Sequence, residues 1–279
     1  MFPKHVLRSL SQAALCVSLS LPLPAQVPTV QSEGARPVIT IDGQTGDWPV
    51  LSFILDAKSG TRLAFQNDGQ DLYILLVLKE PAARVALEST GITVLARTPG
   101  AKSFRGVLFL KRTVPAETYI RWRESQGALM TEGEKAKLRE AVQHSLCLAF
   151  AVGARGSIYG PLRRLRESAP PEFGVSENAA ETIYELKIPL QPPDLVPGGL
   201  GASPGETLRV SFEWGGASRK VLSPKTTMEA SALERSADVS GSGMTWAQEF
   251  LDTFDSLSRP TTGTKKFSFA VDVMLSEAK

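Results

Sequence analysis

Short apolar runs recur along the chain and predict β-strands. They are rich in Val, Ile, Leu, Phe and Tyr and are bounded by Gly, Pro, Asn or Asp, as strands of a globular domain usually are. The runs cover residues 38–41, 62–66, 71–78, 91–96, 106–112, 146–152, 182–188, 207–214 and 266–275. Because few helical patterns interrupt them, we expect a mainly all-β fold, an antiparallel β-sandwich.

Two of these runs also predict burial. Between residues 267 and 273, large apolar side chains occupy every second position, so one face of this strand should be buried and the other largely in water. Residues 72–78 are nearly all apolar. We therefore expect this strand to lie at the centre of a sheet, covered on both faces.

Helical patterns appear in two places. Thr131 and Glu134 form a capping-box sequence, which predicts a helix over residues 135–143 within a helical insertion at residues 115–145. Over residues 245–257, large apolar residues recur at helical spacing and predict a C-terminal helix packed on the sandwich.

Three stretches predict loops. Residues 170–178 open with two prolines, and residues 191–205 are rich in Pro and Gly, which predicts an irregular link. Residues 215–243 are polar and weakly patterned. A loop of that length is uncommon unless it is functional or disordered.

The first residues have the features of a secretory signal peptide. Lys4 and Arg8 give a basic start, a short apolar stretch follows, and Ala25 supplies a small residue at the exit. We expect a signal peptide at residues 1–25, a polar tether at 26–37 and one domain over 38–279. The mature protein is then secreted or periplasmic, and the apolar stretch is shorter than the roughly 20 residues of a membrane-spanning helix.

Charge and cysteine content narrow the classes of partner. Loss of residues 1–25 removes two basic residues and no acids, so the 31 basic residues fall to 29, against 29 acidic ones. A neutral chain lacks the basic surface of a nucleic-acid-binding protein, so no nucleic-acid partner is expected. Cys147 is alone after processing and lies in an apolar run, which predicts a buried thiol rather than a disulfide or a nucleophile.

Three separated motifs resemble those of a known family. Residues 38–48 contain Asp42, Gly43, Asp47 and Trp48 in an "IDG…DW" pattern, residues 61–78 contain an Asn-Asp-Gly turn between two strands, and residues 182–190 contain Tyr184, Glu185 and Pro189 in a "YE…IP" pattern. Together they resemble the family 9 carbohydrate-binding modules and the related DOMON-like β-sandwich domains. The resemblance implies a sandwich fold and a saccharide ligand, with the quoted residues in structural roles.

A saccharide-binding surface needs exposed aromatic rings, because the C–H faces of sugars lie flat on them. The candidates are Tyr119, Trp122, Tyr159 and Trp214. Trp122 has charged neighbours, which indicates a partly exposed ring, and Trp214 precedes two glycines, which would place it at a rim of the sandwich. For each ring, closing an edge of the core is the alternative role.

No cofactor is expected, although two stay open as alternatives. Calcium would need oxygens from Asp42, Asp47, Asp68 and Asp71, if the two loops that carry them meet. The DOMON-like resemblance implies haem as the second alternative, with His144 opposite a methionine. The methionines in question are Met130, Met228, Met244 and Met274.

Catalytic chemistry has little support in the sequence. A single histidine after processing excludes a two-histidine metal site, and no Gly-x-Ser-x-Gly elbow is present. Paired carboxylates for glycoside hydrolysis are compatible with any chain of this composition. The sequence therefore predicts an exported, non-catalytic module for a saccharide. The alternatives are a structural or interaction domain with a cell-envelope protein partner, and a haem-binding electron carrier.

Overall fold

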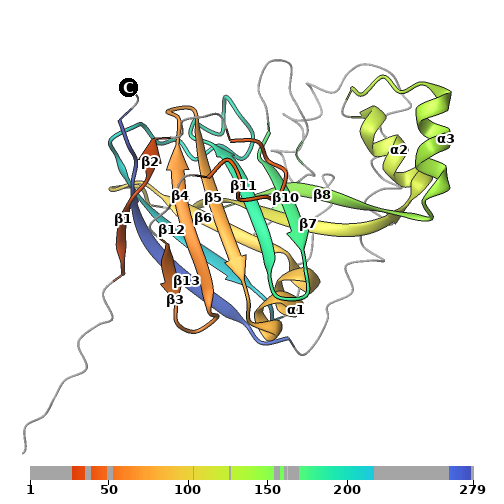
Figure 1. Ribbon diagram of the computed structural model, residues 1–279. Helices are drawn as coiled ribbons and strands as arrows, with labels where there is room; N and C mark the ends of the chain where they lie inside the picture. Colours follow the sequence, from red (N-terminus) through yellow and green to blue (C-terminus); the bar gives the residue numbers. More distant parts are fainter. Residues whose placement is uncertain are drawn as a thin grey trace, which may run out of the picture.

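The computed structural model describes residues 27–34, 39–48, 53–102, 104–125, 127–153, 158–159, 162, 170–216 and 264–277. Two β-sheets pack face to face in these residues, which confirms the predicted β-sandwich (Figure 1). Sheet A follows the order β1 (Thr29–Gln31), β13 (Phe267–Met274), β12 (Thr207–Trp214), β6 (Ile92–Arg97), β7 (Arg105–Pro115), β8 (Gln143–Val152) and β9 (Ile158–Tyr159). Sheet B follows the order β10 (Glu172–Glu177), β11 (Thr182–Pro189), β5 (Asp71–Leu78), β4 (Thr61–Asn67) and β2 (Glu33–Gly34), with β3 (Ile54–Asp56) also paired to β4.

The main core lies between the two sheets. It contains the inward side chains of β5, β6, β7, β11, β12 and β13, many of them without any exposed surface. On β5, Leu72 and Leu76 face this core, whereas Leu75 and Val77 face a separate apolar cluster on the outside of sheet B. Both faces of β5 are therefore buried, which confirms the prediction for residues 72–78.

Two local predictions are wrong, and both fail for the same reason. Residues 39–41 do not pair as a strand; Ile39 and Ile41 instead cover the outer face of sheet B together with Trp48. Residues 172–177, predicted as part of a loop, form β10 and pair with β11 over their whole length. Apolar residues show that a segment is buried, but a distant partner decides whether it joins a ladder.

The helices are α1 (Pro81–Thr90), α2 (Ala116–Ser125) and α3 (Glu132–Glu140). The sequence pattern did not predict α1, which begins at a proline, a residue that the first turn of a helix tolerates. Its inward residues Ala83, Ala86 and Leu87 join the main core. In the chain, α1 connects β5 to β6, and it closes one end of the sandwich (Figure 1).

The other two helices lie within the stretch predicted as a helical insertion. The capping box between Thr131 and Glu134 is confirmed. However, α3 begins and ends three residues before the helix predicted at 135–143, because residue 143 already belongs to β8. The predicted helix at 245–257 lies outside the described residues, as does most of the predicted loop at 215–243.

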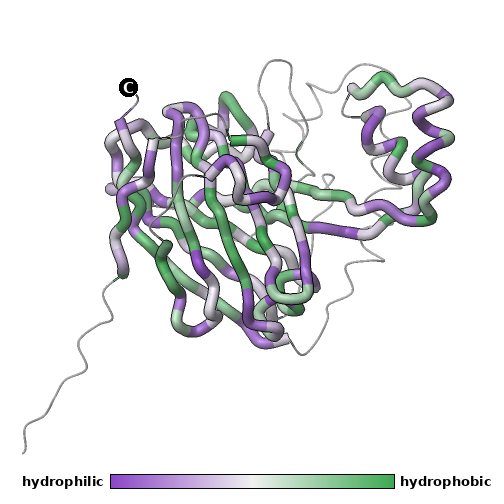
Figure 2. Tube along the Cα trace, viewed as in Figure 1, coloured by the Kyte–Doolittle hydropathy of each residue, from purple (hydrophilic) through white to green (hydrophobic). Residues whose placement is uncertain are grey.

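The α2 and α3 helices form a hairpin that projects from the sandwich at the end of the β7–β8 ribbon (Figure 1). Ion pairs join the two helices, with 2.6 Å between Arg139 Nε and Glu117 Oε1 and 2.8 Å between Lys135 Nζ and Glu124 Oε1. None of the α3 residues is buried. Figure 2 accordingly shows a largely hydrophilic hairpin beside the more hydrophobic strands.

The segment expected to be a tether is in part a structural element of both sheets. β1 pairs in parallel with β13 of sheet A, and β2 pairs in parallel with β4 of sheet B. Between them, the fully buried Ser32 donates its hydroxyl to Asn67 Oδ1 at 2.5 Å. Ser276 N donates to Ser32 Oγ at 2.9 Å and to Asn67 Oδ1 at 2.8 Å, so three distant segments meet in one buried polar network.

This network predicts that residues 27–34 stabilise the domain. A chain that begins at Ala35 should be less stable by about 2 kcal/mol or more than one that begins at Val27, because Asn67 and Ser276 lose buried partners and β13 and β4 each lose an edge strand. Urea unfolding of both chains measures the difference. Equal midpoints would show that the segment is a dispensable tether.

Candidate functional site

Glu185 joins the "IDG…DW" motif of residues 38–48 to the "YE…IP" motif of residues 182–190. Its side chain is fully buried, and its carboxylate accepts hydrogen bonds from the indole N–H of Trp48, from Gly43 N at 2.6 Å and from Asp42 N at 3.0 Å. Burial raises the pKa of Glu185 above its usual range, while the three donors oppose that rise. The carboxylate thus anchors the loop of residues 42–48 to β11.

The remaining motif residues also have structural roles. Asp47 Oδ2 accepts from Thr40 N at 2.6 Å, so Asp47 caps a backbone N–H. The buried Tyr184 ring stacks on Phe173 with 6.4 Å between ring centroids, and Pro189 ends β11. These residues hold the loop and the strands together.

The proposed aromatic platform is not formed by the two tryptophans, and their expected exposure is wrong. Trp214 is 3% exposed and stacks on Phe267 within the core, with 5.3 Å between ring centroids. Trp122 is 9% exposed and packs on the apolar outer face of β7 and β8. The alternative role, closing an apolar core, is the one that both rings have.

The two tyrosine candidates give no platform in the described residues either. Tyr119 stacks on His144 with 4.8 Å between ring centroids and packs on the apolar cluster that contains Trp122. Tyr159 belongs to β9, where it pairs with Ala151, and its side chain lies outside the described part of the structure.

Each of the four carboxylates considered for calcium has a separate local partner. Asp42 accepts at 2.8 Å from the backbone N–H two residues ahead, and Asp47 caps its own loop as described above. Asp68 accepts from backbone N–H groups of the hairpin turn, and Asp71 lies 3.4 Å from Lys187 Nζ. Among the described residues, no three His, Cys, Asp or Glu side chains gather into a group that could hold a metal ion.

The haem alternative finds no matching geometry around His144. Its Nε2 lies 2.7 Å from the carbonyl oxygen of Leu138, and its ring is stacked on Tyr119. The candidate methionines lie elsewhere: Met130 is in the turn between α2 and α3, Met274 is exposed on β13, and Met228 and Met244 fall outside the described residues.

The thiol of Cys147 has the environment of a structural residue. It lies on β8 and packs against the main core. Burial raises its pKa to about 11. The thiol is therefore protonated at neutral pH and unsuited to act as a nucleophile.

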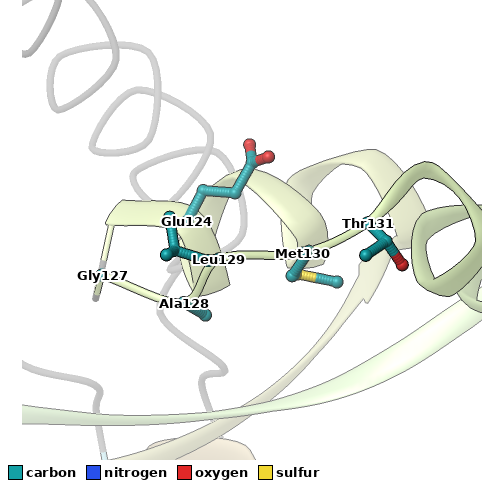
Figure 3. Close-up of a pocket in the computed structure, with 6 residues that line it drawn as sticks. All are labelled: Glu124, Gly127, Ala128, Leu129, Met130 and Thr131. Atoms are coloured by element: carbon teal, nitrogen blue, oxygen red, sulfur yellow. The ribbon is translucent and has the colours of Figure 1, made fainter.

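A shallow pocket lies at the turn between α2 and α3 (Figure 3). Its lining consists of Glu124 and residues 127–131, and the side chain of Leu129 is completely exposed. The carboxylate of Glu124 is already paired with Lys135. The pocket therefore offers apolar contact and no group suited to acid, base or nucleophilic chemistry.

A polar surface on the outer face of sheet A has a different character. Alternation along β6, β12 and β13 turns Arg97, Arg209, Ser211 and Asp272 outward, because their strand neighbours face the core. The sheet register places Arg209 directly between Asp272 and Arg97. We call the outward residues Arg97, Arg209, Ser211 and Asp272, with Phe104 beside them, the polar face.

The charged groups of the polar face are held in fixed geometry. Arg209 donates from Nε and Nη2 to the two carboxylate oxygens of Asp272, each at 2.8 Å. These hydrogen bonds lower the pKa of Asp272, so it is ionised at neutral pH. The guanidinium of Arg97 lies over the ring of Phe104, with 4.9 Å from Cζ to the ring centroid.

Sequence reasoning missed all of these residues, although one signal was available. Along β12, buried apolar residues alternate with Arg209, Ser211 and Glu213, so an outward polar face could have been predicted. What joins that face to Arg97 and Asp272 is the pairing with β6 and β13, which come from distant parts of the chain.

A scan against protein-family models and a search of curated proteins each gave no match. Two solved structures are similar in architecture. One is a family 9 carbohydrate-binding module from Caldicellulosiruptor kristjanssonii in complex with glucose, with 10% identity, a TM-score of 0.34, and a match over 67% of this chain and 77% of that chain. The other is a proposed carbohydrate-binding protein from Bacteroides uniformis, with 7% identity, a TM-score of 0.37, and a match over 68% of this chain and 84% of that chain. Likenesses of this strength carry no argument about the ligand, which has to be inferred from this chain's own residues.

Proposed function

We propose that this protein is an exported, non-catalytic module that binds a saccharide on the polar face of sheet A. The observation that carries the proposal is the row of Asp272, Arg209 and Arg97 across three adjacent strands, with the Phe104 ring at its end. Guanidinium groups donate hydrogen bonds to sugar hydroxyl oxygens, and carboxylates accept hydrogen bonds from sugar O–H groups. The row can therefore satisfy a hydroxyl both as acceptor and as donor. The aromatic ring at the end of the row supplies apolar contact.

The other outer faces of the sandwich are apolar and covered, and this contrast favours the polar face as the binding surface. On sheet B, Leu75 and Val77 are covered by the loop that Glu185 anchors. On sheet A, the outward side chains of β7 and β8 form a buried apolar cluster. Within the described residues, the polar face combines hydrogen-bonding groups with solvent access, since 40% of the Arg209 side chain and 22% of the Asp272 side chain are exposed.

The half-buried position of these groups suits a weak, reversible ligand contact. Arg209 and Asp272 order each other before a ligand arrives, so little side-chain freedom is lost on binding. The polar face contains neither His nor Cys, which commonly serve as base and nucleophile in covalent catalysis. Binding without chemistry is the function that this geometry supports best.

Calorimetric titration of the chain from Val27 with soluble glucans, xylans and galacturonans tests the proposal. We expect saturable binding to at least one polymer, weakened about tenfold or more in Arg209→Ala, because a charged hydrogen-bonding group is lost. Lys137→Ala removes the same charge from the exposed surface of α3 and should leave binding unchanged. No binding across the panel, or equal losses in both variants, would contradict a saccharide site on this face.

A protein partner on the α2–α3 hairpin is a second candidate function. Leu129 is 100% exposed and Val142 is 85% exposed, and both belong to the region between β7 and β8 that projects from the sandwich. Exposed apolar side chains on a projecting element are typical of contact surfaces.

Among the described residues, none of the helices combines the length and the apolar character that a membrane span requires.

A further inference from the structure

The two arginines of the polar face differ in how their donors are used. Arg209 directs two of its donors to Asp272, one to each carboxylate oxygen, and each oxygen keeps a further lone pair. No described residue accepts a hydrogen bond from the Arg97 guanidinium, whose contact is the Phe104 ring. A guanidinium held flat on a ring directs its donors outward from the ring edge, so within the described part of the structure Arg97 is placed to bind an anion.

The charged residues near Arg97 also favour the binding of an anion. The loop from residue 98 to residue 104, which connects β6 to β7, contains one basic residue, Lys102, and no acid. Arg105 pairs with the inward-facing Ala96 and its guanidinium lies toward Gly201, so it adds no charge to the polar face. Across the strand, Arg209 is neutralised by Asp272, so that pair adds no net charge. The end of the polar face at Arg97 is therefore positive, although the chain that follows the expected signal peptide is formally neutral.

We propose that the polar face selects acidic saccharides and that Arg97 binds the carboxylate of a uronic acid. This inference rests on the proposed saccharide-binding function and names its ligand class. The carboxylate would accept a forked pair of hydrogen bonds from Arg97, while hydroxyls of the same or the next sugar contact the Arg209–Asp272 pair. A single local positive site fits a polymer with one carboxylate per sugar better than it fits a nucleic acid, which needs a basic surface spanning many phosphates.

Polygalacturonate and its fully methyl-esterified form provide a matched pair of ligands, since they share one saccharide chain and differ in charge. We expect the chain from Val27 to bind the acid about tenfold more tightly than the ester, as the gain of a charge-assisted pair implies. In Arg97→Gln this preference should fall to near unity. Arg97→Lys should retain part of it, and Lys137→Gln on α3 should retain all of it.

The outcomes separate this inference from the function on which it rests. Equal affinity for the acid and the ester in the unmutated chain would overturn the inference and leave saccharide binding standing. A full preference for the acid in Arg97→Gln would overturn the role of Arg97. Tight binding of poly-L-glutamate would show recognition of charge without a sugar and would overturn both proposals, as would the absence of any saccharide binding.

Discussion

Replacing Glu185 by Ala is expected to lower the free energy of unfolding by about 3 kcal/mol or more. The substitution leaves the Trp48 indole N–H and the N–H groups of Gly43 and Asp42 without their acceptor, at a position with no exposed surface. Each orphaned donor adds its own desolvation penalty. Chemical unfolding of the variant and the unmutated chain, at the same pH, measures the loss.

The chain offers two controls for this prediction. Glu172→Ala removes the same side chain from an exposed position on β10 and should change stability by less than about 0.5 kcal/mol. Glu185→Gln keeps one accepting oxygen but replaces the other with an N–H₂ group, which cannot accept from the donors that faced that oxygen, so its loss should fall between those of the other two variants. If Glu185→Ala were no worse than Glu172→Ala, the carboxylate would not be the anchor of the 42–48 loop.

Gly43→Ala should be the second most damaging change, with a loss of about 2–4 kcal/mol. Gly43 has a φ of 81°, in the left-handed region that favours glycine. A Cβ at this position would lie 2.6 Å from Ser176 N and 2.6 Å from the carbonyl carbon of Val175, both backbone atoms of β10. The loop cannot move away without weakening its hydrogen bonds to Glu185, so the thermal midpoint should fall clearly.

Gly46→Ala is the matched control, because Gly46 lies in the same loop and a Cβ there would meet no atom within 4 Å. This variant should unfold at nearly the same temperature as the unmutated chain. If Gly43→Ala and Gly46→Ala behaved alike, the close packing of the loop against β10 would be refuted.

Strand positions could be predicted from the sequence because alternation is a local property. In β12 every second residue is apolar, and those residues do face the core. The same alternation would have placed Trp214 inward with Val210 and Phe212, whereas the two following glycines suggested a rim. Where the two signals disagreed, the strand period was the better guide to burial.

The burial of Trp122 shows a limit of neighbouring residues as evidence. Arg121 and Arg123 flank it in sequence, but on a helix adjacent residues point in different directions, so their charge says little about the ring between them. Trp122 faces the outer surface of β7 and β8, which its position in α2 allows. Only the placement of α2 on the β7–β8 ribbon could have revealed this.

The sites themselves depend on pairings across long stretches of chain. Glu185 lies 137 residues from Trp48, and Arg209 lies 63 residues from Asp272. Before the register is known, each is one of many acidic or basic residues, and nothing local distinguishes it. The "IDG…DW" and "YE…IP" motifs pointed to the first pair through a family resemblance, while no motif pointed to the polar face.

The most direct test of saccharide binding at the polar face is an amide chemical-shift map of the isotopically labelled chain from Val27, recorded with and without oligogalacturonate. Binding there predicts that the largest shifts fall on the backbone amides of Arg97, Arg209, Ser211 and Asp272, and that they saturate with ligand. The absence of shifts, or shifts confined to the turn between α2 and α3, would contradict it.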